Sequence, residues 1–213
     1  MRRPSTRRAL GTLAATAAAA LLAVTGCGDG GHESTTGPAA PDLNRAPAGV
    51  HWQTWQGVAL PVSSTDGPAD IDAAATGYSH TPQGAALAAI QHSIRTMLAP
   101  DDSWPTIAAR SLVPLSPGAD AWKLTRVLVS KIKTDPAAVP RIAGYKITSW
   151  SPGRAAVTVY TTYSDASVLA SDTTVTWTAG DWRLLLPDPA AKIVTQHDVP
   201  AVPADAVRLE AQR

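Results

Sequence analysis

The period of the apolar residues changes once along this chain, and that change limits the folds that the chain can adopt. Between Pro82 and Lys133 apolar residues recur every three to four positions, which is the helical period. From Arg141 onward they alternate with polar residues, which is typical of strands with one buried face. Helices followed by strands predict an α+β domain, in which N-terminal helices pack on a curved antiparallel sheet.

Turn residues divide the second part into four strands, over residues 142–150, 156–163, 168–178 and 182–186. Short polar or glycine-containing segments join them, so we expect an antiparallel meander. The last turn places Trp177 opposite Trp182, and Val175 opposite Leu184, on one face of the hairpin. The chain has seven Trp and no Phe, so we expect this pair to fill core volume; the alternative is an exposed docking patch.

Capping signals predict three helices, over residues 82–98, 104–112 and 117–133. Each begins at Thr or Ser with a proline in the first turn, a combination that favours a helix start. In the first helix the buried stripe is expected to be Leu87, Ile90, Ile94 and Met97, with His92 facing solvent. In the third helix the expected stripe is Trp122, Thr125, Leu128, Val129 and Ile132, opposite a basic, solvated face.

The N-terminus resembles the signal peptide of a bacterial lipoprotein. A basic start is followed by a short apolar run over residues 9–24, and then by Val24, Thr25, Gly26 and Cys27. This tetrapeptide resembles a lipobox, and the resemblance implies that Cys27 carries the membrane lipid after cleavage in front of it. An Arg7-Arg8 pair leaves twin-arginine export open beside the general route. We therefore expect a lipid anchor on the extracytoplasmic face of the cell membrane.

The expected organisation is a signal peptide (1–26), a flexible tether (27–49), one α+β domain (50–188) and a loosely held C-terminal tail (189–213). Residues 61–80 are expected to form a solvated acidic loop that contains Asp66. At the start of the domain, Trp52 and Trp55 are expected to pin an arm onto the body, or to form a possible interaction surface. From residue 27 the chain has a net charge of −3, which argues against a nucleic-acid partner.

The sequence contains no motif of a known hydrolase, phosphate loop or metalloprotease, and only one cysteine. Glu occurs only at positions 33 and 210, so catalytic acids in the domain would have to be Asp. No Asp and His stand at a spacing that indicates catalysis. We expect no catalytic residues, no metal and no cofactor.

Three segments resemble exported actinobacterial proteins that are often encoded near conjugation genes. They are GYSHTPQGAALAAIQHSIR (77–95), SWSPGRAAVTVYTTY (149–163) and TVTWTAGDWRLLLP (174–187). They also resemble the periplasmic assembly-factor domains of type IV secretion systems. The resemblance implies the cone-shaped fold of the nuclear-transport-factor-2-like superfamily and carries no catalytic residue. Assembly factors of that family usually have a transmembrane anchor, so a lipobox is a departure.

The expected function is a non-enzymatic interaction or assembly module at the membrane, accessory to a conjugation or secretion apparatus and bound to an envelope protein. Two alternatives stay open, because this type of fold supports several functions. One is a lipoprotein that binds a small ligand in the cavity of the cone. The other is an enzyme with a pocket like that of ketosteroid isomerase. A deep apolar pocket, an exposed apolar patch, or an Asp or His with a shifted pKa inside the cavity would distinguish the three.

Overall fold

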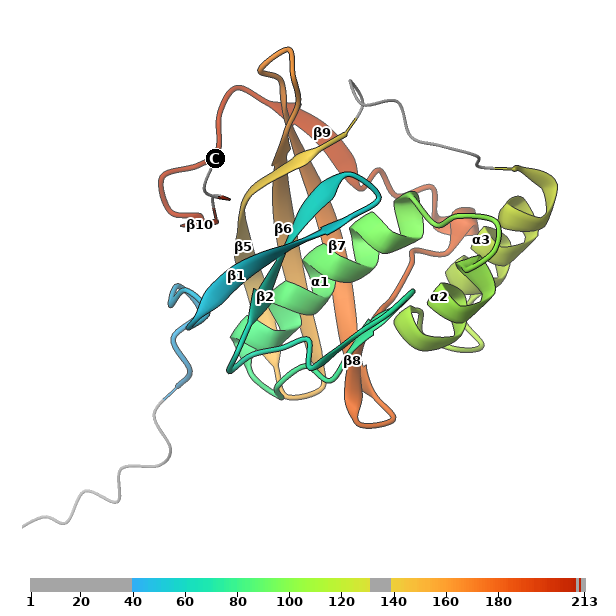
Figure 1. Ribbon diagram of the computed structural model, residues 1–213, viewed down its shortest axis with the longest axis horizontal. Helices are drawn as coiled ribbons and strands as arrows, with labels where there is room; N and C mark the ends of the chain where they lie inside the picture. Colours follow the sequence, from blue (N-terminus) through green and yellow to red (C-terminus); the bar gives the residue numbers. More distant parts are fainter. Residues whose placement is uncertain (1–39, 131–138, 210, 212–213) are drawn as a thin grey trace, which may run out of the picture. The chain divides into compact units, whose positions relative to one another are not determined.

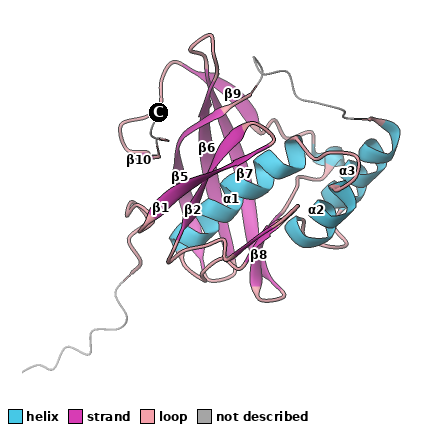
Figure 2. Ribbon diagram, in the orientation of Figure 1, coloured by secondary structure: helices cyan, strands magenta, loops and turns pink. Residues whose placement is uncertain are grey.

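The computed structural model describes residues 40–130, 139–209 and 211, and it shows a mixed α+β fold (Figures 1 and 2). The helix α1 lies against the main sheet, and α2 and α3 lie together at one end of the molecule. In chain order the elements are β1 (Val50–Trp55), β2 (Val58–Ser63), β3 (Asp70–Ile71), β4 (Ala75–Thr76), α1 (Pro82–Met97), α2 (Trp104–Ser111), α3 (Pro117–Leu128), β5 (Arg141–Ser151), β6 (Arg154–Thr162), β7 (Val168–Thr178), β8 (Asp181–Leu184), the 3-10 helix Pro189–Ala191, β9 (Gln196–Val199) and β10 (Val207–Arg208).

Within the described residues, the main sheet is open and has six antiparallel strands. Its order is β10-β5-β6-β7-β8, and β9 pairs with the same edge of β7 as β8 does, at the other end of that long strand. The four predicted strands are β5 to β8, and their antiparallel pairing is confirmed. The sheet is larger than predicted because β9 and β10 join it.

The β7–β8 hairpin has the predicted register. Trp177 pairs with Trp182, and Val175 pairs with Leu184. Ala179 and Gly180 form its turn, and both have positive φ angles, 54° and 81°, as the tight turns that match the twist of a hairpin require. The two indole rings meet edge to face at 5.3 Å, and Trp182 is completely buried. The prediction that this tryptophan supplies core volume is confirmed.

Helix α1 is buried on nearly all sides because strands cover two of its faces. The main sheet packs on one face, and β2 and β4 pack on another (Figure 1). The predicted stripe of Leu87, Ile90 and Ile94 is buried, which confirms it, and Met97 is half-buried. A helix enclosed in this way must also bury its polar side chains.

Those polar side chains fasten the N-terminal part of the domain to α1. Gln91 donates from Nε2 to the carbonyl oxygen of Pro61 at 3.0 Å. Arg95 donates from Nη1 to the carbonyl oxygens of Asp72 and Ala73, at 2.8 and 2.9 Å. Arg95 also donates from Nε to Gln91 Oε1 at 3.0 Å, so the helix buries both side chains with their polar groups hydrogen-bonded.

The expected solvated loop over residues 61–80 is wrong at Asp66, which is 1% exposed. Its Oδ1 accepts hydrogen bonds from the hydroxyls of Ser79 and Thr81, both at 3.1 Å. Thr81 in turn accepts from the backbone N–H of Gly84 and caps α1. The aspartate therefore supports the start of α1 instead of facing water.

Two predicted boundaries differ from the structure. The compact unit begins at Ala40, ten residues before the predicted start, because Gln83 donates to the carbonyl oxygens of Asp42 and Arg45. The segment expected to be a loose tail, 189–213, supplies β9 and β10. A Cβ atom at Gly144 would lie 2.5 Å from the carbonyl oxygen of Val207, so glycine permits the close approach of β10 to β5.

In the part of the chain that the structure describes, no helix is both long and apolar enough to cross a membrane.

Candidate functional site

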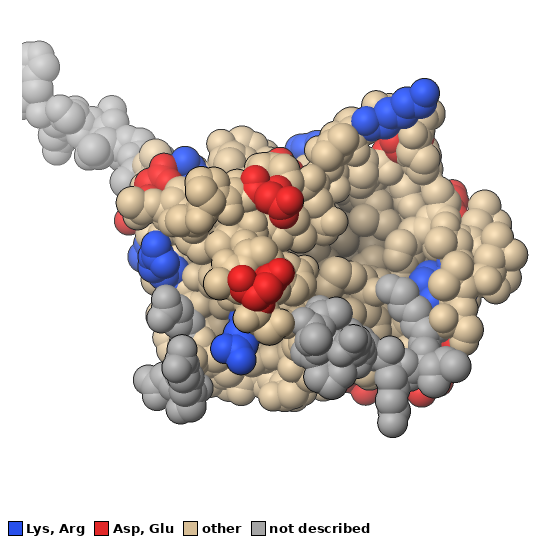
Figure 3. All heavy atoms as spheres, turned by 90° about the horizontal axis from the view of Figure 1, so that it is seen from above, with Lys and Arg blue, Asp and Glu red and all other residues tan. Residues whose placement is uncertain are grey.

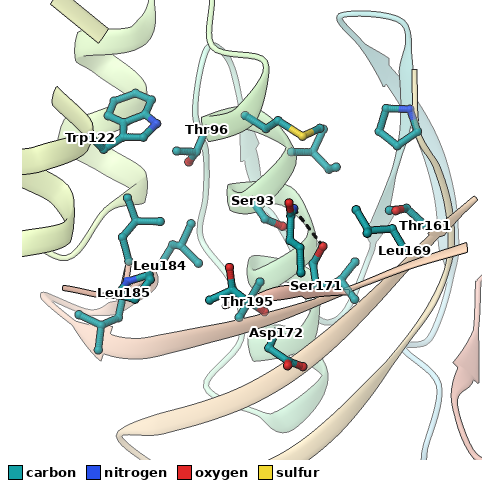
Figure 4. Close-up of a pocket in the computed structure, with 18 of the residues that line it drawn as sticks. Ser93, Thr96, Trp122, Thr161, Leu169, Ser171, Asp172, Leu184, Leu185 and Thr195 are labelled. Atoms are coloured by element: carbon teal, nitrogen blue, oxygen red, sulfur yellow. Dashed lines mark hydrogen bonds between the residues drawn. The ribbon is translucent and has the colours of Figure 1, made fainter. Parts of the chain in front are cut away.

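A pocket of about 300 Å³ opens between the C-terminal half of α1 and the main sheet (Figure 4). Figure 3, which views the molecule from above Figure 1, shows a hollow with a floor of uncharged residues. The pocket is lined by residues from α1, α3, β6, β7 and the chain around β8 and β9: Ser93, Ile94, Thr96, Met97, Trp122, Pro140, Val159, Thr161, Tyr163, Leu169, Ser171, Asp172, Thr173, Leu184, Leu185, Leu186, Pro187, Thr195 and Gln196. Its volume is at the lower end of the range of small-molecule sites, about 300–1,000 Å³.

The pocket opens where the edge of the sheet is interrupted. β8 pairs with residues 175–178 of β7 and β9 pairs with residues 168–171, and the chain between β8 and β9 leaves that edge. The two ends of this excursion, residues 185–187 and 195–196, line the pocket. Helix α3 approaches the same place, since a Cβ atom at Gly118 would lie 2.4 Å from the carbonyl oxygen of Leu186.

The predicted solvent-facing position of His92 is wrong. Its side chain is completely buried, because β8 covers the side of α1 that the sequence left open. Nε2 lies 2.9 Å from the carbonyl oxygen of Trp182, and no described group bonds to Nδ1. Burial lowers the pKa of His92 to about 4, and the Trp182 carbonyl opposes that shift. The ring is therefore neutral at physiological pH, with the Nε2 proton donated to Trp182.

The aromatic residues around His92 make contacts that hold neighbouring parts of the fold together. Tyr78 meets the His92 ring edge to face at 5.3 Å, and burial raises the pKa of its hydroxyl well above the usual value. Trp182 donates from Nε1 to the carbonyl oxygen of Ser79 at 3.0 Å. Asp181 accepts from the backbone N–H groups of Gly77 and Tyr78. The cluster thus joins β8 to the chain that enters α1, and none of these residues lines the pocket.

Asp172 is the one carboxylate that lines the pocket within the described residues. Its Oδ1 accepts from the hydroxyl of Thr158 at 2.7 Å, on the sheet face opposite α1, and Figure 4 shows the carboxylate turned away from the cavity. His197 lies 4.0 Å from its other oxygen, and both side chains are about half exposed. This distance is too long for a hydrogen bond, so the pair lacks the geometry of a general base with its orienting acid.

The exposed face of α3 is apolar, whereas the sequence predicts a basic, solvated face, and this prediction is wrong. Leu128, expected in the buried stripe, is 84% exposed, and Leu124 and Val127 are 69% and 70% exposed. The buried side of the helix holds Ala119 and Arg126 instead. We call Leu124, Val127 and Leu128 the α3 face; their spacing places them on one side of the helix, away from the body.

The contacts of Arg126 account for the orientation of α3, in which the α3 face points outward. Its Nη2 donates to the carbonyl oxygen of Ala99 at 3.0 Å and to Asp101 at 2.8 Å, and its side chain is 3% exposed. The guanidinium ties α3 to the end of α1, and Trp122 packs against Trp104 of α2 at 6.1 Å. A charged residue thus occupies the side that the periodicity assigned to apolar residues. The helix ends at Leu128, and the predicted continuation to Lys133 reaches residues outside the described chain.

Among the predicted site residues, Trp52 and Trp55 lie on the β1–β2 hairpin and are half-buried. The guanidinium of Arg95 lies 4.9 Å from the centre of the Trp55 ring, so that ring covers a buried charge of α1. Val24, Thr25, Gly26 and Cys27 lie outside the described residues. The described residues contain no group of three or more His, Cys, Asp or Glu that could hold a metal ion.

A cavity was expected only as what the resemblance to the cone-shaped fold implies, and sequence reasoning identified neither its lining nor the α3 face. The pocket is made by residues distant in sequence, so no local pattern marks it. The α3 face did leave a signal, because apolar residues occur on several sides of that helix.

Comparison with known proteins gives one match. A sequence model described as "Domain of unknown function (DUF8175)" matches residues 12–203. No curated protein and no solved structure matches the chain.

Proposed function

The chain belongs to the DUF8175 family, and we propose that this member is a lipid-anchored module that docks an envelope protein at the extracytoplasmic face of the cell membrane. The α3 face carries this proposal. Three large apolar side chains on one side of a helix, each more than two-thirds exposed, are typical of a surface that is covered by a partner.

The N-terminal sequence supports the location. The basic start, the apolar run and the residues Val24 to Cys27 have the order of a lipoprotein signal. Cys27 is the only cysteine, so it is the only residue that can carry a thioether-linked lipid. We expect Cys27→Ser to abolish labelling with a radioactive fatty acid, and labelling that survived would contradict the anchor.

The position of the α3 face is compatible with a protein partner. In Figure 1 the chain that leads into β1 lies at the end of the compact unit opposite α3. A lipid on Cys27 would keep the start of that unit within about 45 Å of the membrane, because 12 residues separate Cys27 from Ala40. We expect the α3 face to be free to meet other envelope proteins.

We also propose that the fold is a variant of the nuclear-transport-factor-2-like cone and that the partner belongs to a conjugation or secretion apparatus. A long helix on an open antiparallel sheet, with a cavity between them, is similar to the nuclear-transport-factor-2-like cone. The β1–β2 hairpin, which covers the other side of α1, is an addition to that plan. The resemblance of three segments to actinobacterial and type IV secretion proteins favours a conjugation or secretion apparatus as the partner.

We propose no catalytic role for this protein. The buried histidine donates to a backbone carbonyl and does not line the pocket, and the carboxylate of Asp172 points away from it. These observations do not favour the alternative of an enzyme similar to ketosteroid isomerase.

Site-specific photocrosslinking in the producing cells tests the docking surface. A photoreactive amino acid at Leu124 is expected to give one discrete crosslinked product in the membrane fraction, while the same group at the exposed Ser149 of β5 gives none. Leu128→Asp should remove the product, and Thr125→Asp, on the same helix, should keep it. Crosslinks to lipid alone, or equal products from both positions, would contradict a protein-docking role.

A further inference from the structure

We propose that the pocket binds a small, uncharged, mainly apolar molecule with one hydrogen-bonding group, and that this group pairs with the hydroxyl of Thr161. This ligand site is separate from the α3 face and does not depend on a docking function. Two features of the pocket support such a ligand: the lack of an available charge in its lining, and one buried hydroxyl without a partner in the described chain.

The lining offers no charge to a ligand. Its 19 residues include no Lys, Arg, His or Glu. Asp172 is already bonded to Thr158 on the other face of the sheet. A charged ligand would lose its hydration without gaining a counter-ion, which strongly disfavours its binding. Ten of the other 18 lining residues are Leu, Ile, Val, Met, Trp or Pro, and these favour an apolar molecule.

One polar atom of the wall lacks a partner. Thr161 is 4% exposed, and no group in the described chain bonds to its Oγ1. Thr161 lies on β6, on the same face as Val159, and its side chain lines the pocket (Figure 4). A buried hydroxyl without a partner is unfavourable, and few native hydroxyls are left so. A ligand that donates to or accepts from Oγ1 removes that cost, so its polar group should sit there.

Several other hydroxyls of the wall already donate to backbone carbonyl oxygens. Ser93 donates to the carbonyl oxygens of Ala89 and Ile90, and Thr96 donates to that of His92. At the rim, Gln196 donates from Nε2 to Ser171 Oγ at 3.3 Å (Figure 4). Among the buried side-chain polar atoms of the described wall, Thr161 Oγ1 is the one without a hydrogen-bond partner, so we expect it to select the ligand. Residues 185–187 and 195–196, at the two ends of the chain between β8 and β9, border the cavity.

Three matched probes test the proposal. 2-Acetylnaphthalene is neutral and accepts one hydrogen bond, 2-naphthoate has the same ring system with a negative charge, and 2-ethylnaphthalene has no acceptor. Binding to the full chain in lipid nanodiscs is followed by ligand-observed NMR, and empty nanodiscs give the partition into lipid. We expect saturable binding of 2-acetylnaphthalene and at least tenfold weaker binding of 2-naphthoate.

Thr161→Val removes the hydroxyl and keeps the shape of the side chain almost unchanged. It should weaken 2-acetylnaphthalene about three- to tenfold, as the loss of one neutral hydrogen bond does, and leave 2-ethylnaphthalene unchanged. Thr162→Val is the matched control, because the next residue of β6 faces the other side of the sheet and is expected to change neither probe. Circular dichroism establishes that both variants are folded. Equal binding of the neutral and charged probes, no saturable binding, or an unchanged affinity in Thr161→Val would each overturn the proposal.

Discussion

Helices α1 and α3 differ in opposite ways from the burial expected of their residue types: α1 buries polar side chains, and α3 exposes apolar ones. α1 buries Gln91, His92 and Arg95, each at most 1% exposed, whereas α3 exposes Leu124, Val127 and Leu128. Both helices begin with the same device, a capping hydroxyl followed by proline. Their local signals are therefore equivalent, and the difference comes from what surrounds them. Strands cover α1 on two faces, while α3 is held on one side by Trp122 and Arg126.

This difference teaches that burial along a helix is decided by the partners it has and by the bonds its polar groups can make. A buried guanidinium is tolerated where backbone carbonyls accept from it, as Arg95 and Arg126 both show. The apolar side chains that α3 leaves in water fit the docking partner proposed for it. Four measurements can break or sharpen this comparison.

The largest effect is expected where β8 packs on α1. Trp182→Ala should lower the free energy of unfolding by about 3–5 kcal/mol, because the side chain is fully buried and its indole N–H is bonded to Ser79. Chemical denaturation of the full chain measures this. Trp177→Ala, which removes the half-buried partner ring, should cost less. A loss below about 1 kcal/mol in Trp182→Ala would mean that β8 does not hold α1.

The second effect is a loss of stability in acid. Burial lowers the pKa of His92 from 6.5 to about 4, so below pH 6.5 the unfolded chain takes up a proton that the folded chain refuses. Stability contributed by the neutral ring is present above pH 6.5 and is lost as the pH falls toward 4, by about 3 kcal/mol.

His92→Gln isolates this contribution. Urea denaturation at pH 6.5 and pH 4 should show a smaller pH-dependent loss in the variant than in the native chain, by about 3 kcal/mol. If the two chains lost stability equally, His92 would be accessible to water, and α1 would not be enclosed as described.

The third effect compares the two helix caps. Thr81→Ala should cost about 1–2 kcal/mol, because the hydroxyl caps Gly84 at 3.1 Å and also donates to the buried Asp66. Ser116→Ala should cost about 0.5–1 kcal/mol, since its cap bond to Ala119 is longer, at 3.4 Å. Thermal unfolding of both variants gives the order, and a larger loss at Ser116 would contradict it.

The smallest effect is expected on the α3 face. Leu124→Asn together with Leu128→Asn should change the free energy of unfolding by no more than about 0.5 kcal/mol, because both side chains are already in water. Chemical denaturation measures it, and Ile107→Asn in the buried face of α2 is the contrasting variant. A large loss in the α3 variant would show that this face is covered within the chain itself.

Sequence alone predicted the parts of the fold that local signals control. The register of Trp177 with Trp182 follows from a tight turn, and the start of α1 follows from Thr81 and Pro82. The solvent-facing position expected of His92 was wrong because a helical period describes one buried face, and α1 has two. The assignment of Leu128 to a buried stripe failed for a related reason: Arg126, a charged residue, binds Ala99 and so sets the rotation of α3.

The residues of the candidate site could not be predicted because they come together only after long-range pairing. Thr161 looks like an ordinary strand residue in the sequence, and its missing partner is visible only when α1 covers it. β9 and β10 pair with strands that precede them by about 30 and 60 residues. The local sequence therefore predicts only a loosely held tail at these positions. Edge strands of two to four residues carry too little alternation to be recognised.

The excursion of the chain between β8 and β9 has a consequence for how such a domain can diversify. Insertions and deletions in exposed segments are tolerated because loop-closure entropy changes slowly with length. Residues 188–194 lie in this excursion, outside the paired strands, so changes in their number leave the register of β7 with both neighbours intact. The two ends of the same excursion form the rim of the cavity. A change in this one loop can therefore reshape the rim of the cavity while the register of the main sheet stays the same.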